Sequence, residues 1–443
     1  MNARSNPRAA VAAALGEMEN GAYSNIALSR RLNAGSYTPA EKAFAARLFY
    51  GVIERKLTLD YIIARRAAKS PEPLVKNILR AALYELAYMN SSREYAVVDE
   101  SVKLCKTFGK TSAGSFVNAV LRGFIRAGKR VDFSGISDRL ERLSVEYSCG
   151  RDVLESLIDS LGEEETINIL QMTFGKSRQY IRANTMKISP SELSRRLCAE
   201  GIACEENFLP GCVSVDGSMV LESLQSFREG LFHVQDLSSQ ICASLFGGLR
   251  NSRIFDLCAA PGGKSFTIAQ LAENSQVFAF DIHDFKIKLI REGAERLGLS
   301  DRVNALIGDA AVFNPETGRA DAVLCDVPCS GLGVAAKKPE IKYKSRKEYE
   351  NLPEIQLKIL NNAAQYLEGG GLLVYSSCTL LKNENQRITE RFERENPDFP
   401  PCELPDYLNS CFTNEKKNSA LISPETFGSD GFYISAWRKK FGI

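Results

Sequence analysis

Apolar residues recur at three- and four-residue spacing through the first part of the chain, with few β-branched runs. Phe116, Val117, Val120, Leu121 and Phe124 form one such stripe. This spacing places the apolar side chains on one face of a helix. The pattern therefore predicts an all-α bundle of about five to seven helices over residues 1–135.

Between residues 136 and 240 the pattern changes from helical to mixed. After further helical stretches, strand-like segments occur at residues 180–182, 202–208 and 213–215, with a helix at 189–200. Glycine, proline and serine are too sparse here for a flexible linker. We therefore expect a small α+β connecting module that packs against its neighbours.

Beyond Gln240 the chain alternates between strand-like and helix-like stretches. The predicted strands are 253–257, 276–281, 303–307, 321–326 and 372–376, and the predicted helices are 264–272, 285–297 and 354–367. This alternation is typical of a doubly wound, mainly parallel sheet that binds ligands at the carboxyl ends of its strands. Residues 241–443 are thus predicted to form an α/β domain.

Length and composition favour a protein of several domains. The chain has 443 residues, of which 44% are hydrophobic, whereas a single core seldom grows beyond about 250–300 residues. No apolar run is long enough to cross a membrane, and residues 1–8 lack the apolar stretch of a signal peptide. We expect a cytoplasmic protein.

Twelve cysteines and two histidines narrow the chemistry. The cysteines are scattered, and none lies in a Cys-x2-Cys pair of the metal-binding kind, so we expect free thiols in a reducing compartment. His233 and His283 alone supply little for a metal site or for histidine acid–base catalysis. We expect no metal, and chemistry that depends on cysteine, aspartate and lysine.

Charge is unevenly distributed. Residues 1–130 contain 21 Lys and Arg against 10 Asp and Glu, a net charge of +11, and the remainder contains 35 against 44, a net charge of −9. A basic front region suggests contact with a polyanion. An ordinary solvated helical surface explains the charge about equally well.

Three segments of this basic region resemble the RNA-binding NusB antitermination-factor family. They are Leu48-Phe49-Tyr50-Gly51-Val52-Ile53-Glu54-Arg55, Leu59-Asp60-Tyr61-Ile62 and Phe116-Val117-Asn118-Ala119-Val120-Leu121-Arg122. The resemblance covers nearly all of residues 1–135. It implies a NusB-like helical RNA-binding domain.

A turn of small residues joins the first predicted strand of the sheet to its helix. It reads Asp256-Leu257-Cys258-Ala259-Ala260-Pro261-Gly262-Gly263-Lys264. Such a turn lets backbone N–H groups and the helix N-terminus approach a polar ligand. It is not the dinucleotide fingerprint, because Cys258 and Ala260 stand where glycines are expected, and alone it would indicate only a tight turn.

Two further acids favour a ligand site over a plain turn. Asp281 ends the second strand about 20 residues after the turn, where a carboxylate can accept both hydroxyls of a ribose. Asp309 follows the third strand, well placed to meet an adenine edge. A single acid in such a place is more often a helix cap. Capping explains three acids at successive strand ends poorly.

Together these segments resemble the S-adenosylmethionine methyltransferase fold, and the turn resembles that of the RNA cytosine-C5 methyltransferases. The resemblance implies an α/β Rossmann-like catalytic domain. The implied cofactor-binding residues are Cys258, Ala259, Ala260, Pro261, Gly262, Gly263, Lys264, Asp281, Lys286, Asp309 and Asp326. Lys286 stands where this family usually has arginine, which keeps the charge but loses the bidentate fork.

Two cysteine motifs follow the next pair of strands. They are Asp326-Val327-Pro328-Cys329-Ser330-Gly331 and Tyr375-Ser376-Ser377-Cys378-Thr379. In the methyltransferase topology these strands are neighbours, about 4.8 Å apart, so both thiols should open into one crevice beside the cofactor. Most of the twelve cysteines are expected to be small buried hydrophobic residues. The motifs set Cys329 and Cys378 apart from them.

Methylation at carbon 5 of cytosine requires a nucleophile at carbon 6, because the ring is too electron-poor to accept a methyl group directly. A thiolate suits this step, since it attacks well and can also leave. A hydrogen bond or proton at N3, which a carboxyl group can supply, stabilises the enamine that forms.

In the family resembled here, the nucleophile lies in the later motif and the Pro-Cys cysteine assists product release. The resemblance therefore implies that Cys378 is the nucleophile, Cys329 the release thiol and Asp326 the acid that contacts the cytosine. DNA cytosine methyltransferases use the Pro-Cys cysteine as nucleophile instead, so the presence of Cys378 favours RNA. Ser377 replaces the usual threonine and keeps the hydroxyl.

Further matches extend the resemblance over almost the whole chain. They are Ile181-Arg182-Ala183-Asn184-Thr185, Val234-Gln235-Asp236 with Ser239-Gln240, Pro339-Glu340-Ile341-Lys342-Tyr343, Asn383-Glu384-Asn385 and Asp430-Gly431-Phe432-Tyr433. A NusB-like domain ahead of such a catalytic domain resembles the bacterial small-subunit rRNA methyltransferases of the B type. This implies 16S ribosomal RNA as the partner, and we expect a monomer.

Two other functions compete with this interpretation. In a noncatalytic RNA-binding or assembly factor the sheet would be a vestigial scaffold, and the presence of Cys329, Cys378 and Asp326 argues against it. An adenine amino-group methyltransferase typically needs an Asp/Asn-Pro-Pro-aromatic loop after the fourth strand. Val327-Pro328-Cys329 does not match that loop.

Overall fold

The computed structural model describes residues 6–89, 93–175, 178–215 and 221–442. The chain forms two compact units. The helical unit comprises Met1–Glu155 and Lys342–Lys344, and the α/β unit comprises Ser156–Ile341 and Ser345–Ile443. The domain boundaries expected at residues 135 and 240 stay predictions.

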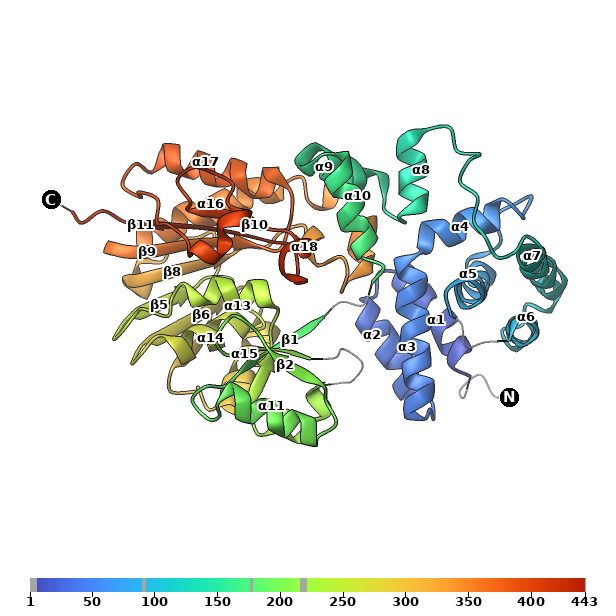
Figure 1. The fold of residues 1–443 in the computed structure, drawn as a ribbon, viewed down its shortest axis with the longest axis horizontal. Helices are drawn as coiled ribbons and strands as arrows, with labels where there is room; N and C mark the ends of the chain where they lie inside the picture. Colours follow the sequence, from blue (N-terminus) through green and yellow to red (C-terminus); the bar gives the residue numbers. More distant parts are fainter. Residues whose placement is uncertain (1–5, 90–92, 176–177, 216–220, 443) are drawn as a thin grey trace. The chain divides into compact units, whose positions relative to one another are not determined.

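The helical unit is an all-α bundle, as the apolar spacing predicts (Figure 1). The predicted stripe lies on α7, where Val117, Val120, Leu121 and Phe124 are all buried. Its helices are α1 (Pro7–Glu19), α2 (Ser24–Asn33), α3 (Pro39–Glu54), α4 (Lys56–Ala64), α5 (Pro73–Tyr88), α6 (Glu94–Thr107), α7 (Gly114–Arg126) and α8 (Arg139–Glu146). A further helix, α9 (Arg151–Leu161), spans the division between the units.

Three residues that lie far along the sequence complete the helical unit. The Tyr343 hydroxyl donates to the carbonyl of Ile53 at 2.5 Å and lies 2.9 Å from the Ser148 hydroxyl. The ammonium group of Lys342, whose residue is 1% exposed, donates to the carbonyls of Glu54 and Tyr147. The segment that the sequence places in the catalytic region is therefore partly built into the helical core.

The α/β unit contains two sheets. The smaller one is antiparallel, in the order β2-β3-β1-β4. It confirms the predicted strands around residues 180–182 and 213–215, but the strand predicted at 202–208 is only three residues long. The elements up to this sheet are α10 (Glu163–Met172), β1 (Gln179–Ala183), α11 (Pro190–Ala199), β2 (Cys204–Glu206), β3 (Cys212–Val215), α12 (Gln225–Arg228) and β4 (Phe232–Val234).

The larger sheet has the order β10-β11-β9-β8-β5-β6-β7. The five strands from β9 to β7 are parallel, as predicted, and β11 and β10 add antiparallel at one side. Its strands are β5 (Arg253–Asp256), β6 (Gln276–Asp281), β7 (Val303–Ile307), β8 (Ala320–Asp326), β9 (Leu367–Ser377), β10 (Ser419–Ile422) and β11 (Phe432–Arg438). The order reverses beside β5, which is where doubly wound sheets bind ligands.

Helices cover both faces of this sheet (Figure 1). Because side chains alternate along a strand, Ile254 packs into the core beneath α13 to α15, whereas Phe255 packs into the core beneath α16 and α17. The helices are α13 (Leu237–Ser244), α14 (Gly263–Leu271), α15 (Asp284–Leu297), α16 (Leu352–Tyr366), α17 (Gln386–Glu395) and α18 (Pro424–Phe427). Strands buried on both faces explain the nearly continuous apolar runs in the sequence.

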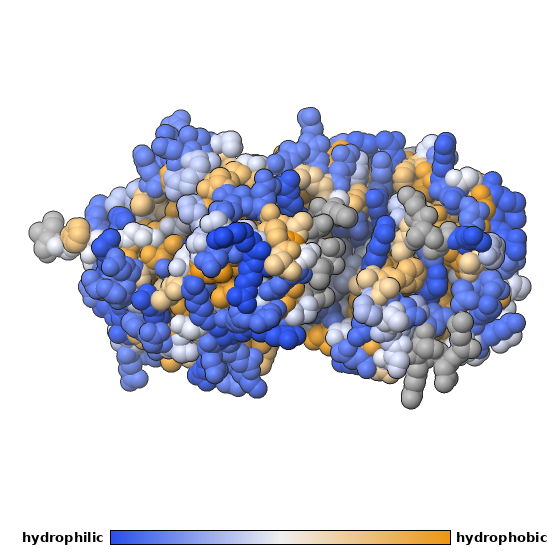
Figure 2. Space-filling view, turned by 60° about the horizontal axis from the view of Figure 1, so that its bottom comes forward, coloured by the Kyte–Doolittle hydropathy of each residue, from blue (hydrophilic) through white to orange (hydrophobic). Residues whose placement is uncertain are grey.

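The face drawn in Figure 2 is mostly hydrophilic, with hydrophobic residues in scattered patches. Within the described part of the chain, no helix combines the length and the apolar character that a membrane span requires.

Candidate active site

A cavity of about 430 Å³ lies at the carboxyl ends of the parallel strands. The fold brings eight of the predicted site residues to its wall: Cys258, Ala260, Asp281, Lys286, Asp309, Asp326, Cys329 and Cys378. Lys264 is absent from the cavity wall but contacts Asp326, which lies in it. The predicted residues therefore gather at one edge of the sheet, and their roles stay predictions.

The turn after β5 depends on a glycine. Gly262 precedes α14 with φ +110°, a conformation that side-chain-bearing residues rarely adopt. A Cβ atom at this position would also lie 2.5 Å from the Phe266 ring. The turn can thus bring the N-terminus of α14 close to the end of β5 only with glycine here.

Asp281 is fixed at the end of β6 by two neighbours. Its carboxylate accepts a hydrogen bond from the backbone N–H of His283 at 3.1 Å and pairs with the Lys286 ammonium at 3.4 Å. A carboxylate held in this way keeps lone pairs for ribose hydroxyls. Asp309 accepts from the Ala311 N–H at 2.9 Å, which orders the loop after β7.

Asp326, at the end of β8, is held at both carboxylate oxygens. Oδ2 lies 2.6 Å from the Lys264 ammonium, and Oδ1 accepts from the Ser376 hydroxyl at 2.8 Å. Burial opposes the charge on Lys264, but Asp326 together with Cys242 and Asp256 outweighs it and raises the pKa of Lys264. The Lys264–Asp326 pair is therefore a fixed pair of charges next to the cysteines.

The two candidate cysteines meet in the cavity, with their Sγ atoms 3.3 Å apart. The hydrogen bond from the Cys329 thiol lowers the pKa of Cys378, although burial opposes this. The same hydrogen bond and burial raise the pKa of Cys329 well above its usual value. The shared hydrogen bond therefore favours deprotonation of Cys378 over that of Cys329.

Backbone contacts hold the Cys378 loop against its neighbours. The carbonyl of Cys378 accepts from the Gly333 N–H at 2.9 Å, and the Gly333 carbonyl accepts from the Gly431 N–H at 2.8 Å. A Cβ on Gly333 would lie only 2.0 Å from the Gly431 carbonyl oxygen. This close approach of the two backbones explains why glycine occurs at position 431 of the Asp430-Gly431 motif.

Several residues of the site were not predicted from the sequence. Ile355 and Ile359 of α16 line the cavity, as do Ile282 and His283. Apolar residues on a helix give no sign that they face a ligand and not a core. The Ser376 contact could have been inferred, because β8 and β9 pair in register at Asp326 and Ser376.

Comparison with known proteins identifies two families in the chain. Residues 247–438 match the family described as 16S rRNA methyltransferase RsmB/F, and residues 5–126 match the NusB family. The chain is 34% identical to the probable ribosomal RNA small subunit methyltransferase B of Bacillus subtilis (strain 168), over 95% of this chain and 96% of that protein. It is 31% identical to the one of Synechocystis sp. (strain ATCC 27184 / PCC 6803 / Kazusa), over 94% of this chain and 95% of that protein.

Solved structures share the fold. PH0851 matches 98% of this chain and 98% of its own, with a TM-score of 0.82 and 21% identity. NSun6 from Pyrococcus horikoshii with SFG matches 65% of this chain and 97% of its own, with a TM-score of 0.60 and 23% identity. At these identities the likeness concerns the fold alone.

Proposed function

Because the chain belongs to the family of ribosomal RNA small subunit methyltransferase B, whose members methylate 16S rRNA with S-adenosylmethionine, we propose that it methylates carbon 5 of a cytosine through a covalent bond to Cys378. The observation that carries this proposal is the Cys329–Cys378 pair, 3.3 Å apart in the cavity at the carboxyl ends of the strands.

The residues present fit S-adenosylmethionine. The turn around Gly262 suits the polar methionine end, the Asp281 carboxylate suits the ribose hydroxyls and Asp309 suits the adenine edge. Lys286 supports Asp281 by its ion pair. When bound, the cofactor would supply an electrophilic methyl group for transfer to the base.

Attack by Cys378 begins the reaction. The thiolate Sγ forms a bond to carbon 6. The π electrons of the carbon 5–carbon 6 double bond then move through carbon 4 towards N3. The Lys264–Asp326 pair, with Nζ and Oδ2 2.6 Å apart, holds a proton beside the ring to meet that charge. Carbon 5 then has the electron density to accept the methyl group.

Release reverses the attack. The proton on carbon 5 leaves to a solvent base, its electron pair restores the ring double bond, and the bond between carbon 6 and Sγ breaks with its pair on Cys378. The Cys329 thiol, which already donates to this sulfur, stabilises the departing thiolate. This assigns Cys329 to product release.

The helical unit supplies affinity for RNA in this proposal. Residues 1–130 carry a net charge of +11, and phosphate contacts are the main source of sequence-independent binding to nucleic acids. A substrate with many phosphates would thus meet a basic unit joined to a catalytic unit whose own charge is negative overall.

Nucleoside analysis tests the proposed product. We expect 16S RNA treated with the protein and labelled S-adenosylmethionine to yield labelled 5-methylcytidine, and bisulfite sequencing to place it at one position. Label in N4-methylcytidine, or in any nucleoside other than 5-methylcytidine, would refute the assignment of carbon 5. RNA incubated with heat-inactivated protein is the control.

A further inference from the structure

The side chain of Glu384 reaches the loop that carries Cys329. Glu384 ends a short 3-10 helix, η8 (Lys382–Glu384), and is 1% exposed. Its Oε2 atom accepts from the backbone N–H of Ser330 at 2.9 Å. The same atom accepts from the Gln356 side chain at 2.8 Å, and Gln356 also donates to the Pro328 carbonyl. Glu384 thus fixes the backbone on both sides of Cys329.

Glu384 is tied to the strand before Cys378 as well. The Tyr375 hydroxyl donates to the Glu384 carbonyl at 2.5 Å. The Thr379 hydroxyl, next to Cys378, lies 2.7 Å from the Ser330 hydroxyl. The two cysteine loops are therefore joined to each other and to one buried carboxylate.

The Cys378 loop has a second, independent support in Asn385. The Asn385 side chain accepts from the Ser377 hydroxyl at 2.6 Å and donates to the Thr379 carbonyl at 2.8 Å. These contacts bracket Cys378 without involving the Glu384 carboxylate. The carboxylate itself reaches the Cys378 loop through a long hydrogen bond, 3.5 Å from the Thr379 hydroxyl to Oε1. Removing the carboxylate should therefore loosen the Cys329 loop more than the Cys378 loop.

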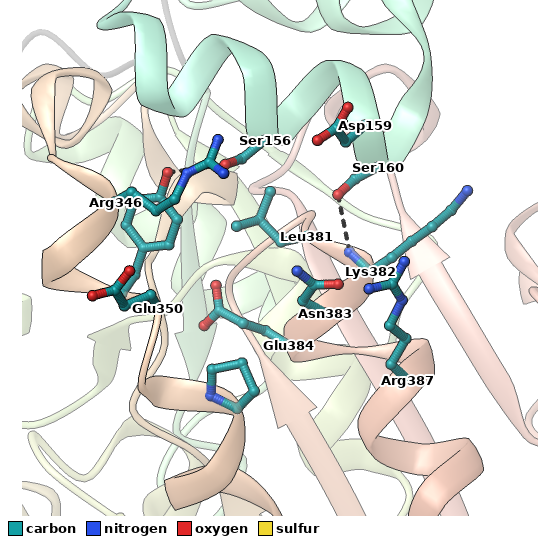
Figure 3. A pocket seen from close by; sticks show the side chains of 12 residues that line it. Ser156, Asp159, Ser160, Arg346, Glu350, Leu381, Lys382, Asn383, Glu384 and Arg387 are labelled. Atoms are coloured by element: carbon teal, nitrogen blue, oxygen red, sulfur yellow. Dashed lines mark hydrogen bonds between the residues drawn. The ribbon is translucent and has the colours of Figure 1, made fainter.

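Burial of the Glu384 carboxylate lowers the stability of the fold unless its hydrogen bonds to water are replaced. A buried charge costs stability unless hydrogen bonds replace its water, and an apolar side chain would avoid that cost. Asn383 and Glu384 also line a pocket together with Asp159 and Ser160 (Figure 3). The Ser330 N–H and the Gln356 side chain nevertheless both donate to Oε2, so this carboxylate is hydrogen-bonded to the Cys329 loop and not left free in the pocket.

We propose that Glu384 is a positioning residue for product release, which keeps the Cys329 thiol against the Cys378 sulfur while the bond from that sulfur to carbon 6 breaks. This inference rests on the proposed covalent mechanism. An amide in place of the carboxylate offers the Ser330 N–H and the Gln356 side chain one neutral acceptor oxygen instead of a charged carboxylate, so the Cys329 loop is held less firmly. Attack and methyl transfer continue, but the methylated RNA stays attached to Cys378.

The test compares Glu384→Gln with wild type in the presence of 16S RNA and S-adenosylmethionine. We expect a band of protein joined to RNA on a denaturing gel, about tenfold or more above wild type, with kcat lowered by a similar factor and cofactor affinity within about twofold. Glu390→Gln, which changes an exposed glutamate on α17, is the matched control and should behave as wild type.

A second variant covers the case in which Glu384→Gln fails to fold. Gln356→Leu removes the other donor to Oε2 and frees the Pro328 carbonyl, so a smaller accumulation of the same band is expected. The double variant should match Glu384→Gln, because both changes act on one network. Lower turnover without the band, or unchanged turnover, in both variants would overturn the role of Glu384.

The same gel separates this role from the mechanism beneath it. Cys378→Ala combined with Glu384→Gln should give no band, since the attacking sulfur is gone. A band that persists in this combination would refute Cys378 as the nucleophile. Loss of the band there, with no accumulation in Glu384→Gln alone, would refute only the positioning role.

Discussion

At the scale of single residues, the two thiols of the site differ in the direction in which their pKa values are shifted. Cys378 has a lowered pKa and Cys329 a raised one, because a hydrogen bond from Cys329 is shared between them. Cys378→Ala should therefore lower methylation by at least about 10³-fold, because it removes the sulfur proposed to attack carbon 6. Cofactor affinity, measured in parallel by calorimetry, should change little. Substantial turnover would exclude Cys378 as the nucleophile.

Cys329→Ala should have the opposite effect on the intermediate. Cys378 can still attack, but its sulfur leaves poorly without the thiol that donates to it. We expect protein joined to RNA to accumulate on a denaturing gel when S-adenosylmethionine is present, and to vanish in the double variant with Cys378→Ala. Accumulation in Cys378→Ala but not in Cys329→Ala would exchange the roles of the two cysteines.

At the scale of elements, the end of β5 carries a carboxylate that opposes folding at neutral pH. Burial raises the pKa of Asp256 to about 7 from its ordinary 3.8. Its Oδ2 atom accepts from the Ser265 hydroxyl at 2.6 Å, and its Oδ1 atom has no hydrogen-bond partner within the described residues. The native state therefore keeps a proton that the unfolded state has already released between about pH 4 and 7.

The free energy of unfolding of the α/β unit should thus fall as pH rises through this range, by at most about 1.4 kcal/mol per pH unit from Asp256. Asp256→Asn should remove that contribution, so the variant gains stability relative to wild type from pH 5 to pH 8. The single tryptophan, Trp437, lies buried in β11, so its fluorescence reports this unit. Equal pH slopes for both proteins would contradict the assignment.

Elements with a clear period were predictable, and those set by distant contacts were not. The parallel strands and their helices followed from the alternation of apolar runs, with β6 and β7 matching residue for residue. The antiparallel strands β10 and β11 were not predicted, since β11 pairs with β9 and β10 pairs with β11, and no local pattern indicates either pairing. The strand at 202–208 is shorter because only Cys204–Glu206 pairs with β3.

The same distinction applies to the site. Residues at strand ends, such as Asp281 and Cys378, could be placed because parallel strands end at one edge. The contact of Lys264 with Asp326 joins residues 62 positions apart, and that of Ser330 with Glu384 joins residues 54 apart. No local spacing indicates such pairs, so the sequence analysis named Glu384 only as part of the Asn383-Glu384-Asn385 motif and predicted no role for it.

At the scale of the whole molecule, the proposed RNA affinity of the helical unit can be assigned to a place. Arg65, Arg66 and Arg130 line a cavity of about 350 Å³ whose one carboxylate, among the described residues, is Asp132. Arg65→Gln with Arg130→Gln should raise the KM for RNA and leave kcat unchanged. The salt dependence of binding should weaken by about 0.7 in slope for each phosphate of single-stranded RNA that the variant no longer neutralises.

Arg66 is best left in place, because its guanidinium lies over the Phe124 ring and donates to the Ile62 carbonyl. Lys42→Gln with Arg47→Gln removes the same charge from exposed positions of α3 and serves as the control. Filter binding at several salt concentrations measures the slope. An equal fall in affinity in both double variants would mean that overall charge, and not this cavity, holds the RNA.

The Lys342–Lys344 segment makes complete folding of the helical unit depend on synthesis of most of the α/β unit. A ribosome releases the chain from its N-terminus, and leading domains generally fold as they emerge. Here the Ile53 carbonyl and the Ser148 hydroxyl form hydrogen bonds with Tyr343. Tyr343 is synthesised only after every strand from β1 to β8. The helical unit therefore leaves the ribosome before the α/β unit but cannot complete its packing until residue 343 has been made. A nascent chain arrested before residue 342 carries a helical unit whose core lacks the Lys342 and Tyr343 side chains.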